Sequence, residues 1–225
     1  DTLLLYKLDT KLKFIDLSNE LAHANTVLLP TTMGAVAVTE QAIINHAHEE
    51  GLIVPNRKRN DDEERTKAAG AYVAYPKKGL HDWIGSIDLN SLYPSVIRAL
   101  NMTPETIVGQ LRPLLTEHAL KTKILDGKTF ADAWEGEFGS KEYQAVMNME
   151  PGTEITIDWE AGDSDTCSAA DVWRLIFDSN NPWILSANGT ILTYEKKGII
   201  PGLLERWYAE RKELQAKMRD TEGEE

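Results

Sequence analysis

The stretch Trp83 to Leu100 constrains this chain most, because an apolar run leads into a carboxylate and then directly into a turn. Ile84 and Ile87 precede Asp88 as apolar residues do in a β-strand, which predicts a strand that ends at the carboxylate. A carboxylate at a strand end is well placed to hold Mg²⁺, which prefers oxygen ligands and keeps several waters. The sequence therefore offers one ligand of a metal site.

The residues after Asp88, from Leu89 to Pro94, depart from a strand pattern and predict a turn. Such a turn would direct backbone N–H groups and the Ser91 hydroxyl at an anion such as phosphate. Asp and Ser also cap helices often, so the alternative is that Asp88 and Ser91 only cap the helix that runs to Leu100. The residues alone leave both interpretations open.

The net charge of −12 argues against a nucleic-acid binder, because affinity for phosphate depends largely on Lys and Arg. The distribution of charge weakens that argument. The segment Asp126 to Asp171 has twelve acidic residues against two basic ones, whereas Lys196 to Arg219 has seven basic residues against three acidic ones. An anionic partner could approach the second segment.

Cys167 is the only cysteine, so an intrachain disulfide framework is excluded and a reducing compartment is expected. The sequence has no run of about 18 apolar residues and no basic-then-apolar pattern at its start. We therefore expect a soluble, cytoplasmic protein without a membrane span or a signal peptide.

Helical periodicity predicts one helix from Thr2 to Ala24 and a second from Thr39 to Glu50, with Gly51 as the stop signal. His46 and His48 lie two apart and point to different faces of that helix, so they make a poor metal pair. The segment 55–67 is dense in charge and predicts a solvated loop, and 70–76 is a short β-prone run.

After Leu100, Pro104 predicts a new helix start. Residues 111–181 predict an acidic α+β insert with a strand at Glu154–Trp159 and helical or mixed structure at Ala169–Phe177. Asn188-Gly189 between two β-rich runs predicts a hairpin with a type I′ turn. Pro201 predicts a helix to about Arg219, with an apolar stripe that also contains Arg211; the stripe comprises Leu204, Trp207, Leu214 and Met218.

The decapeptide Asp88 to Ile97, DLNSLYPSVI, resembles the first polymerase motif of family B DNA polymerases, D-x-x-S-L-Y-P-S-I-I, and departs from it only at Val96. The runs 101–107 (NMTPETI) and 186–201 (SANGTILTYEKKGIIP) are similar to the replicative polymerases of T-even-type phages. In such enzymes the hairpin leads into the first fingers helix, which corresponds here to Gly202 to Met218.

The resemblance implies a role for each matching position. Asp88, helped by the Leu89 carbonyl, would bind the two catalytic Mg²⁺ ions that transfer a nucleotide to a primer 3′-hydroxyl. Ser91 and the Leu92 N–H would hold the triphosphate of the incoming dNTP, and Tyr93 would exclude a 2′-hydroxyl. Arg211 would reach the triphosphate, although a snorkelling role is equally open, and Lys217 is a weaker candidate of the same kind.

Other parts of the family pattern are incomplete in these 225 residues. Asp1 resembles the aspartate of the third exonuclease motif without its preceding tyrosine, and Ala68 replaces the tyrosine before Gly70-Ala71 in a Y-x-G-[GA] element. The second and third polymerase motifs are not found. The run 162–166 (GDSDT) imitates the third motif but lies in the wrong order, so an acidic loop is the favoured interpretation.

We therefore expect an α+β fold: a partial polymerase palm with a mostly antiparallel sheet, an acidic insert and the first fingers helix. The expected divisions are 1–30 (end of the exonuclease domain), 31–76 (linker and palm entry), 77–110 (palm), 111–181 (insert), 182–197 (palm hairpin) and 198–225 (start of the fingers). Expected partners are primer-template DNA, dNTP and a second polypeptide that carries the missing motifs. The alternative is a non-catalytic DNA- or protein-binding fragment of a replication protein.

Overall fold

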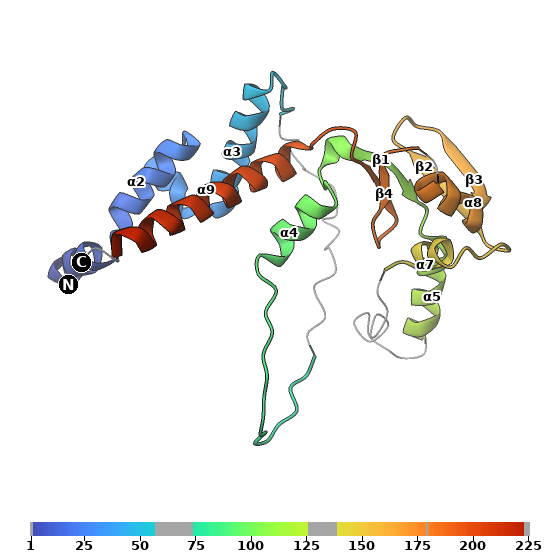
Figure 1. Cartoon of the computed structure of the whole chain (residues 1–225), viewed down its shortest axis with the longest axis horizontal. Coiled ribbons are helices and arrows are strands. Elements are labelled where there is room, and N and C mark those ends of the chain that lie inside the picture. The colour runs from blue at the N-terminus through green and yellow to red at the C-terminus, as the bar shows by residue number, and fades with distance from the viewer. Residues whose placement is uncertain (1, 57–73, 126–138, 179, 223–225) are drawn as a thin grey trace. The chain divides into compact units, whose positions relative to one another are not determined.

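The computed structural model of the chain describes residues 2–56, 74–125, 139–178 and 180–222 (Figure 1). The chain divides into two compact units, Asp1–Asp62 and Glu63–Glu225. Among the described residues, no helix is both long and apolar enough to cross a membrane.

The first unit is helical, and the helix predicted from Thr2 to Ala24 is broken into α1 (Thr2–Leu12) and α2 (Phe14–Asn25). The break lies at Lys13, whose backbone has a left-handed φ of 55°. The Asp9 carboxylate accepts the backbone N–H of Ile15 at 3.0 Å, so it satisfies one donor of the first turn of α2. The Asp9 side chain of α1 therefore supports the start of α2. The spacing of apolar residues does not reveal such a start.

A short 3₁₀ helix, η1 (Leu29–Met33), leads into α3 (Ala35–Glu49), which ends as predicted beside Gly51. Gly51 has φ 75°, and its N–H bonds the His48 carbonyl while the Leu52 N–H bonds the Ala47 carbonyl. This pair of bonds is the Schellman arrangement, for which glycine is favoured because it has no Cβ to clash. Asn45 joins α3 to the end of α2 by donating to the Asn25 carbonyl at 3.1 Å.

The second unit contains a five-stranded antiparallel sheet in the order β3-β2-β1-β5-β4. The central strand β1 (Ile107–Leu111) pairs on one side with β2 (Glu154–Trp159), which β3 (Ser164–Ser168) follows. On its other side β1 pairs with β5 (Thr190–Thr193), and β4 (Trp183–Leu185) is the edge. The predicted α+β class with a mostly antiparallel sheet is confirmed, and the strand predicted at Glu154–Trp159 has those bounds.

Helix α8 (Ala169–Trp173) contacts β2 and β3 and also contacts α7 (Lys141–Met147), and Figure 1 shows α8 beside these strands. The π-helical turn η3 (Arg174–Asp178) follows α8, and α5 (Leu114–Leu125) contacts α7. The core that the sheet shares with α7 and α8 has fully buried aliphatic side chains, each worth about 1.5–3 kcal/mol relative to exposure; they include Val146, Ile155, Ile157, Val172 and Ile191. Between the buried Ile155 and Ile157, the Thr156 side chain of β2 points to the other face of the sheet. There its hydroxyl forms a hydrogen bond of 2.9 Å with the hydroxyl of Thr166 on β3. The alternation explains why the strand was readable from sequence.

The hairpin of β4 and β5 forms at Asn188-Gly189, but its turn is not type I′. A type I′ turn needs positive φ at both central residues, whereas in the described turn only Gly189 has positive φ, at 88°. The Gly189 N–H bonds the Ser186 carbonyl at 2.8 Å, and the Ser186 N–H bonds the Thr190 carbonyl at 2.9 Å. The loop therefore has three residues and ends with a glycine in the left-handed region. The Ser186 hydroxyl also donates to the Thr190 carbonyl at 2.9 Å.

The strand predicted to end at Asp88 is not formed. Residues 84–89 have no regular secondary structure, and the side chains of Trp83 and Ile87 are fully exposed. A strand requires a neighbour that pairs with its backbone, and no described segment pairs with these residues. Of the β-prone run 70–76, only Ala74 to Pro76 lie within the described residues, and they form no strand; most of the predicted charged loop 55–67 lies outside them.

In the second unit, helix α4 (Leu92–Ala99) contains most of the motif Asp88 to Ile97, and helix α9 (Ile199–Glu222) follows the β4–β5 hairpin. The predicted new start at Pro104 is the 3₁₀ turn η2 (Pro104–Thr106). Pro201 lies in the first turn of α9, where its missing N–H costs no hydrogen bond. Helices α4 and α9 pack against each other, with the Arg98 guanidinium 5.0 Å from the centre of the Tyr208 ring.

Glu105 in η2 predicts an acid-sensitive step in the stability of the second unit. Desolvation of its carboxyl by itself raises the pKa, but hydrogen bonds from the Ile199 N–H and the Thr103 hydroxyl outweigh this and lower the pKa, with help from Lys196. A lowered folded-state pKa gives stability that is present above the unfolded-state pKa and is lost as pH falls through the folded-state pKa. We expect Glu105→Gln to lower the melting temperature at neutral pH and to cause a smaller change near pH 3, as measured by circular dichroism.

The exposed Glu160 offers a matched control, because Glu160→Gln should leave the melting temperature unchanged at both pH values. An equal effect of Glu105→Gln at neutral and acidic pH would show that the ionised carboxylate does not supply the stabilisation.

Candidate functional site

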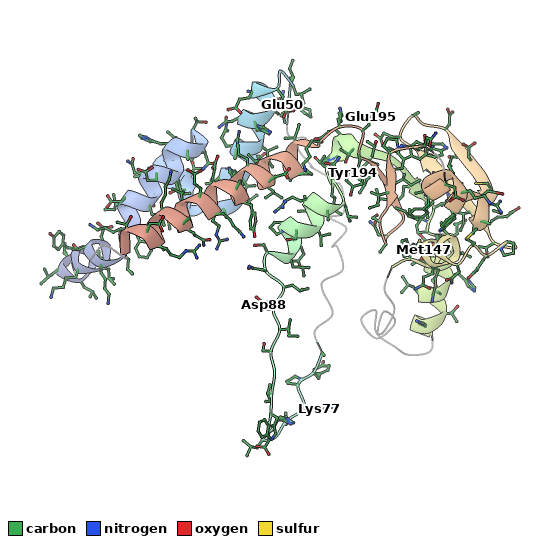
Figure 2. All side chains as sticks on the ribbon, viewed as in Figure 1. Glu50, Lys77, Asp88, Met147, Tyr194 and Glu195 are labelled. Atoms are coloured by element: carbon green, nitrogen blue, oxygen red, sulfur yellow. The ribbon has the colours of Figure 1, made fainter. Side chains whose placement is uncertain are left out.

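Asp88 lies at the end of an extended segment, just before α4 (Figure 2). Its side chain is exposed, and among the described residues it has no hydrogen-bond or ion-pair partner. A carboxylate that the fold does not use can take a cation from solvent, and an oxygen donor suits Mg²⁺. The carbonyl of Leu89 follows in irregular, exposed backbone, so it is also accessible to a ligand.

The structure at Ser91 does not agree with the alternative that Asp88 and Ser91 only cap the helix that follows them. Ser91 occupies the N-cap position of α4 with φ 53° and ψ 48°, and no side chain makes a capping hydrogen bond there. The first backbone N–H groups of a helix have no partner within the helix, and at α4 these belong to Leu92 and Tyr93, since Pro94 has none. The capping alternative is therefore wrong for the side chains of Asp88 and Ser91, and the turn presents backbone donors without a side-chain cap.

The left-handed backbone at Ser91 gives a prediction in which stability and binding change in opposite directions. This conformation costs a residue with a Cβ about 1–2 kcal/mol, whereas glycine adds about 0.5–1 kcal/mol of chain entropy to be lost on folding. Ser91→Gly should therefore raise the free energy of unfolding by up to about 1 kcal/mol, as measured with urea. The same change removes the hydroxyl and should weaken the binding of an anion such as phosphate, which the sequence predicts at this turn.

Ser95 is the matched control, because it is an exposed serine within the same helix. Ser95→Gly should lower the free energy of unfolding by a few tenths of a kcal/mol, about the difference in helix propensity. A loss of stability in Ser91→Gly as large as in Ser95→Gly would contradict the strain at Ser91.

Tyr93 projects from the first turn of α4 and is 74% exposed. Its ring is therefore available for contact with a ligand that occupies the turn. The structure brings Asp88, Leu89, Ser91, Leu92 and Tyr93 together because they form one continuous stretch of chain. Their proximity depends on local structure alone.

Arg211 lies on the exposed part of α9 and lines a shallow groove of about 360 Å³ together with Trp207, Leu214 and Met218. Among the described residues it has no carboxylate partner and no hydrogen bond to the motif. The apolar neighbours suit a snorkelling stem, and the unpaired guanidinium suits an anion, so both interpretations stay open. Lys217, the weaker candidate, pairs with Glu213 at 2.7 Å.

The remaining predicted elements are less informative. Asp1, Ala68 and Gly70-Ala71 lie outside the described residues. Residues 162–166 form the tight turn between β2 and β3 and the start of β3, and Asp165 accepts the indole N–H of Trp159 at 2.7 Å. The described residues contain no group of three or more His, Cys, Asp or Glu side chains that could hold a metal ion.

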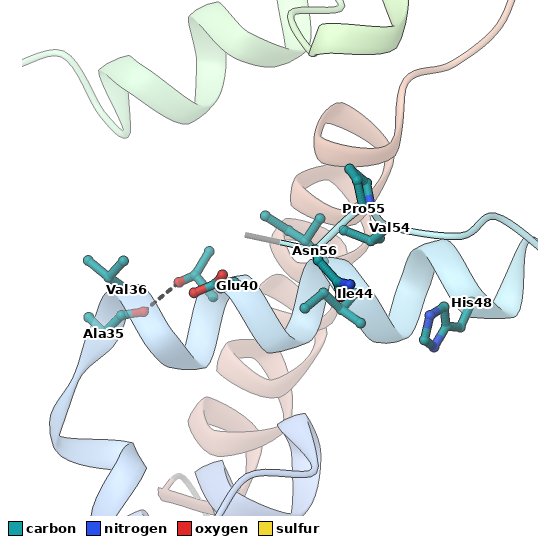
Figure 3. A pocket seen from close by; sticks show the side chains of 10 residues that line it. Ala35, Val36, Glu40, Ile44, His48, Val54, Pro55 and Asn56 are labelled. Atoms are coloured by element: carbon teal, nitrogen blue, oxygen red, sulfur yellow. Dashed lines mark hydrogen bonds between the residues drawn. The ribbon is translucent and has the colours of Figure 1, made fainter. Parts of the chain in front are cut away.

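The first unit contains a groove of about 850 Å³ beside α3 (Figure 3). Its lining is mostly apolar and includes Val36, Ile44 and Val54, and the Thr39 hydroxyl within it bonds the Ala35 carbonyl at 2.8 Å. His46 lies near the carboxylates of Glu49 and Glu50, at 3.4 and 3.3 Å. Glu40, His48 and Asn56 also line the groove, and none of them belongs to the motif Asp88 to Ile97.

Sequence analysis missed the contacts that join α4 to α9. Arg98 of α4 lies over the Tyr208 ring of α9, with its guanidinium carbon 5.0 Å from the ring centre. The separation of more than one hundred residues leaves no local pattern that predicts such a contact.

The sequence of the chain is similar to a protein family and to individual known proteins. The family model described as DNA polymerase family B matches residues 29–225. The chain is similar to the DNA-directed DNA polymerases of Escherichia phage RB69 (28% identical over 106 residues, 47% of this chain) and Enterobacteria phage T4 (32% over 99 residues, 44% of this chain). It is also 33% identical over 98 residues, 43% of this chain, to DNA polymerase 2 of Aeropyrum pernix.

The matched segments span 11% of each of the two phage polymerases and 12% of the archaeal one. The family model, by contrast, covers most of the present chain, including the motif turn at Asp88–Tyr93 and helix α9. The chain therefore belongs to DNA polymerase family B.

Proposed function

We propose that this chain supplies part of the nucleotidyl-transfer site of a DNA polymerase. The observation that carries the proposal is the turn from Asp88 to Tyr93, which combines an unpartnered carboxylate, an uncapped helix start and an exposed ring. These are the features needed to bind a metal-bound triphosphate and its sugar.

The residues fit a magnesium site because both donors at hand, the Asp88 carboxylate and the Leu89 carbonyl, are accessible oxygen atoms. Mg²⁺, when bound, supplies charge stabilisation of the transferring phosphoryl group. Ser91 and the Leu92 N–H bind the triphosphate, Tyr93 packs against the sugar, and Arg211 contributes a second cationic contact. In the reaction the primer 3′-oxygen loses its proton and bonds to the α-phosphorus, the α–β phosphoanhydride bond breaks, and pyrophosphate leaves.

The divisions expected from the sequence, from the exonuclease end at 1–30 to the fingers start at 198–225, belong to this proposal. A two-metal site needs further carboxylates, and the described residues show no cluster of them. We infer that the missing ligands lie on polypeptide that carries the second and third polymerase motifs, such as a second chain. Primer-template DNA is then the shared substrate, and the cytoplasm is the proposed compartment.

The test is titration of the chain with dNTP in the presence and absence of Mg²⁺, followed by calorimetry. We expect Mg²⁺-dependent binding that Asp88→Asn abolishes. Asp82→Asn is the matched control, because Asp82 is an exposed aspartate of the same extended segment, and this variant should bind as the unaltered chain does.

The alternative function is a non-catalytic DNA- or protein-binding fragment, which the absence of a carboxylate cluster among the described residues favours. Under this alternative neither dNTP nor Mg²⁺ binds at Asp88, even when primer-template DNA and a polypeptide with the later motifs are present. The same titration therefore separates the two functions.

A further inference from the structure

Five residues form a junction cluster where α4 ends and α9 begins: Asn101, Thr103, Glu105, Thr106 and Gly198. Asn101 is its centre and is only 1% exposed. Its N–H bonds the Arg98 carbonyl and the next N–H, of Met102, bonds the Ile97 carbonyl, with φ 50° at Asn101. Asn101 therefore ends α4 in the left-handed conformation that asparagine tolerates better than most residues.

The Asn101 side chain connects this helix end to a segment more than ninety residues away. Its Nδ2 donates to the carbonyls of Thr193 and Lys196, both at 2.8 Å. Its Oδ1 accepts the N–H of Gly198 at 2.9 Å. Because both amide hydrogens and the amide oxygen are used in a buried site, the side chain holds the end of β5 and the approach to α9 in one arrangement.

The other members of the cluster close the same junction. The Thr106 hydroxyl donates to the Asn101 carbonyl at 2.6 Å, and Glu105 accepts the N–H of Ile199, the first residue of α9, at 2.7 Å. Gly198 packs so closely that an added Cβ would lie 2.2 Å from Cγ2 of Thr103, which is itself buried. Any larger residue at 198 therefore has to push the start of α9 away from η2.

Helix α9 is held at this root and near Tyr208, whereas its side chains from 209 to 221 are exposed. Arg211 lies in that exposed part, about two turns beyond Leu203, which is buried. The direction of α9, and with it the position of Arg211, depends on how the root is fixed, because a small rotation at the root grows along a rigid helix.

We propose that Asn101 is a positioning residue that fixes the root of α9 against the end of α4 and so sets the approach of Arg211 to the turn at Ser91. The consequence for Arg211 rests on the proposed function, whereas the fixed root rests on the hydrogen bonds of the junction cluster. A residue of this kind touches no substrate and acts through the helix that it holds.

The test measures the α4–α9 distance directly by electron double resonance. Spin labels are attached at Ser95→Cys and Gln215→Cys, both at exposed positions, in a Cys167→Ser background. Asn101→Gly keeps the left-handed backbone but removes three hydrogen bonds, and it should broaden the distance distribution. Gly198→Ala should shift its mean, because the added methyl group wedges the root open.

Glu142→Gln is the matched control, since Glu142 is also 1% exposed and lies at another helix end in the same unit. It should leave the α4–α9 distribution unchanged. If Asn101→Gly fails to fold by circular dichroism, Asn101→Asp takes its place, because the carboxylate keeps the shape and the acceptor for Gly198 but faces two carbonyls without a donor. Unchanged distributions in the folded Asn101 and Gly198 variants would overturn the proposal.

A second measurement connects the junction to nucleotide binding. The Mg²⁺-dependent affinity for dNTP should fall on the order of tenfold in Asn101→Gly, because misplacement of a binding group by about 1 Å is costly. Retained affinity with a broadened distribution overturns the consequence for Arg211. If the unaltered chain binds no dNTP, the proposed function fails and the consequence for Arg211 fails with it, while the distance measurement still decides whether Asn101 fixes the root.

Discussion

Asp88→Asn is expected to reduce template-directed nucleotide incorporation by about three orders of magnitude, or roughly 4 kcal/mol of transition-state stabilisation. The assay is extension of a labelled primer by the chain together with a polypeptide that carries the second and third polymerase motifs. Asparagine keeps the shape of the side chain but removes the charge that attracts Mg²⁺. Because Asp88 is exposed and has no partner among the described residues, the melting temperature should not change.

Asp82→Asn again serves as the control and should leave primer extension within about twofold of the unaltered chain. Two results would contradict the prediction in different ways. Full activity in Asp88→Asn would remove Asp88 from the metal site. Activity of the isolated chain, abolished by Asp88→Asn, would confirm the role of Asp88 and refute the need for another polypeptide.

Glu142→Ala is expected to lower the free energy of unfolding of the second unit by about 3 kcal/mol, as measured by urea denaturation. The Glu142 carboxylate on α7 accepts the backbone N–H groups of Leu115 (2.5 Å) and Thr116 (3.0 Å) and also the Thr116 hydroxyl. Pro113 accepts the Glu117 N–H at 3.0 Å just before α5 and has no side-chain acceptor, so Glu142 performs the capping of α5 from a distance. Its removal leaves the N–H and hydroxyl of the buried Thr116, and the N–H of Leu115, without this acceptor.

Glu142→Gln separates charge from shape, because the amide oxygen can still accept from the helix start while the negative charge is lost. Its cost should be about 1 kcal/mol. Glu160→Ala, at an exposed glutamate in the turn after β2, should change stability by less than about 0.5 kcal/mol. Equal stability of Glu142→Ala and Glu160→Ala would contradict the capping role.

Elements defined by local pattern were predictable from the sequence. The alternation of Glu154–Trp159 gave the bounds of β2, and Gly51 marked the end of α3, because periodicity and a glycine stop act within a few residues. The hairpin at Asn188-Gly189 was predicted but its turn type was wrong, since the Ser186 hydroxyl stabilises a longer loop. The break at Lys13 was missed because a side-chain bond from Asp9, and not an apolar period, decides it.

Elements that need a distant partner were not predictable in the same way. The apolar run before Asp88 reads as a strand, yet no described segment pairs with it and it stays extended and exposed. Conversely, β1 pairs with β2 on one side and with β5 of the hairpin on the other. No local sequence signal indicates that these distant segments pair.

The sequence by itself determined the motif turn, because Asp88, Ser91 and Tyr93 follow one another along the chain and need no tertiary contact to lie together. Only the tertiary structure decided that the Ser91 side chain makes no capping hydrogen bond, that β1 is the centre of the sheet and that Asn101 joins α4 to α9. The physical reason is range: backbone propensity and periodicity act over a few residues, whereas strand pairing and buried hydrogen bonds depend on which distant groups remain to be satisfied.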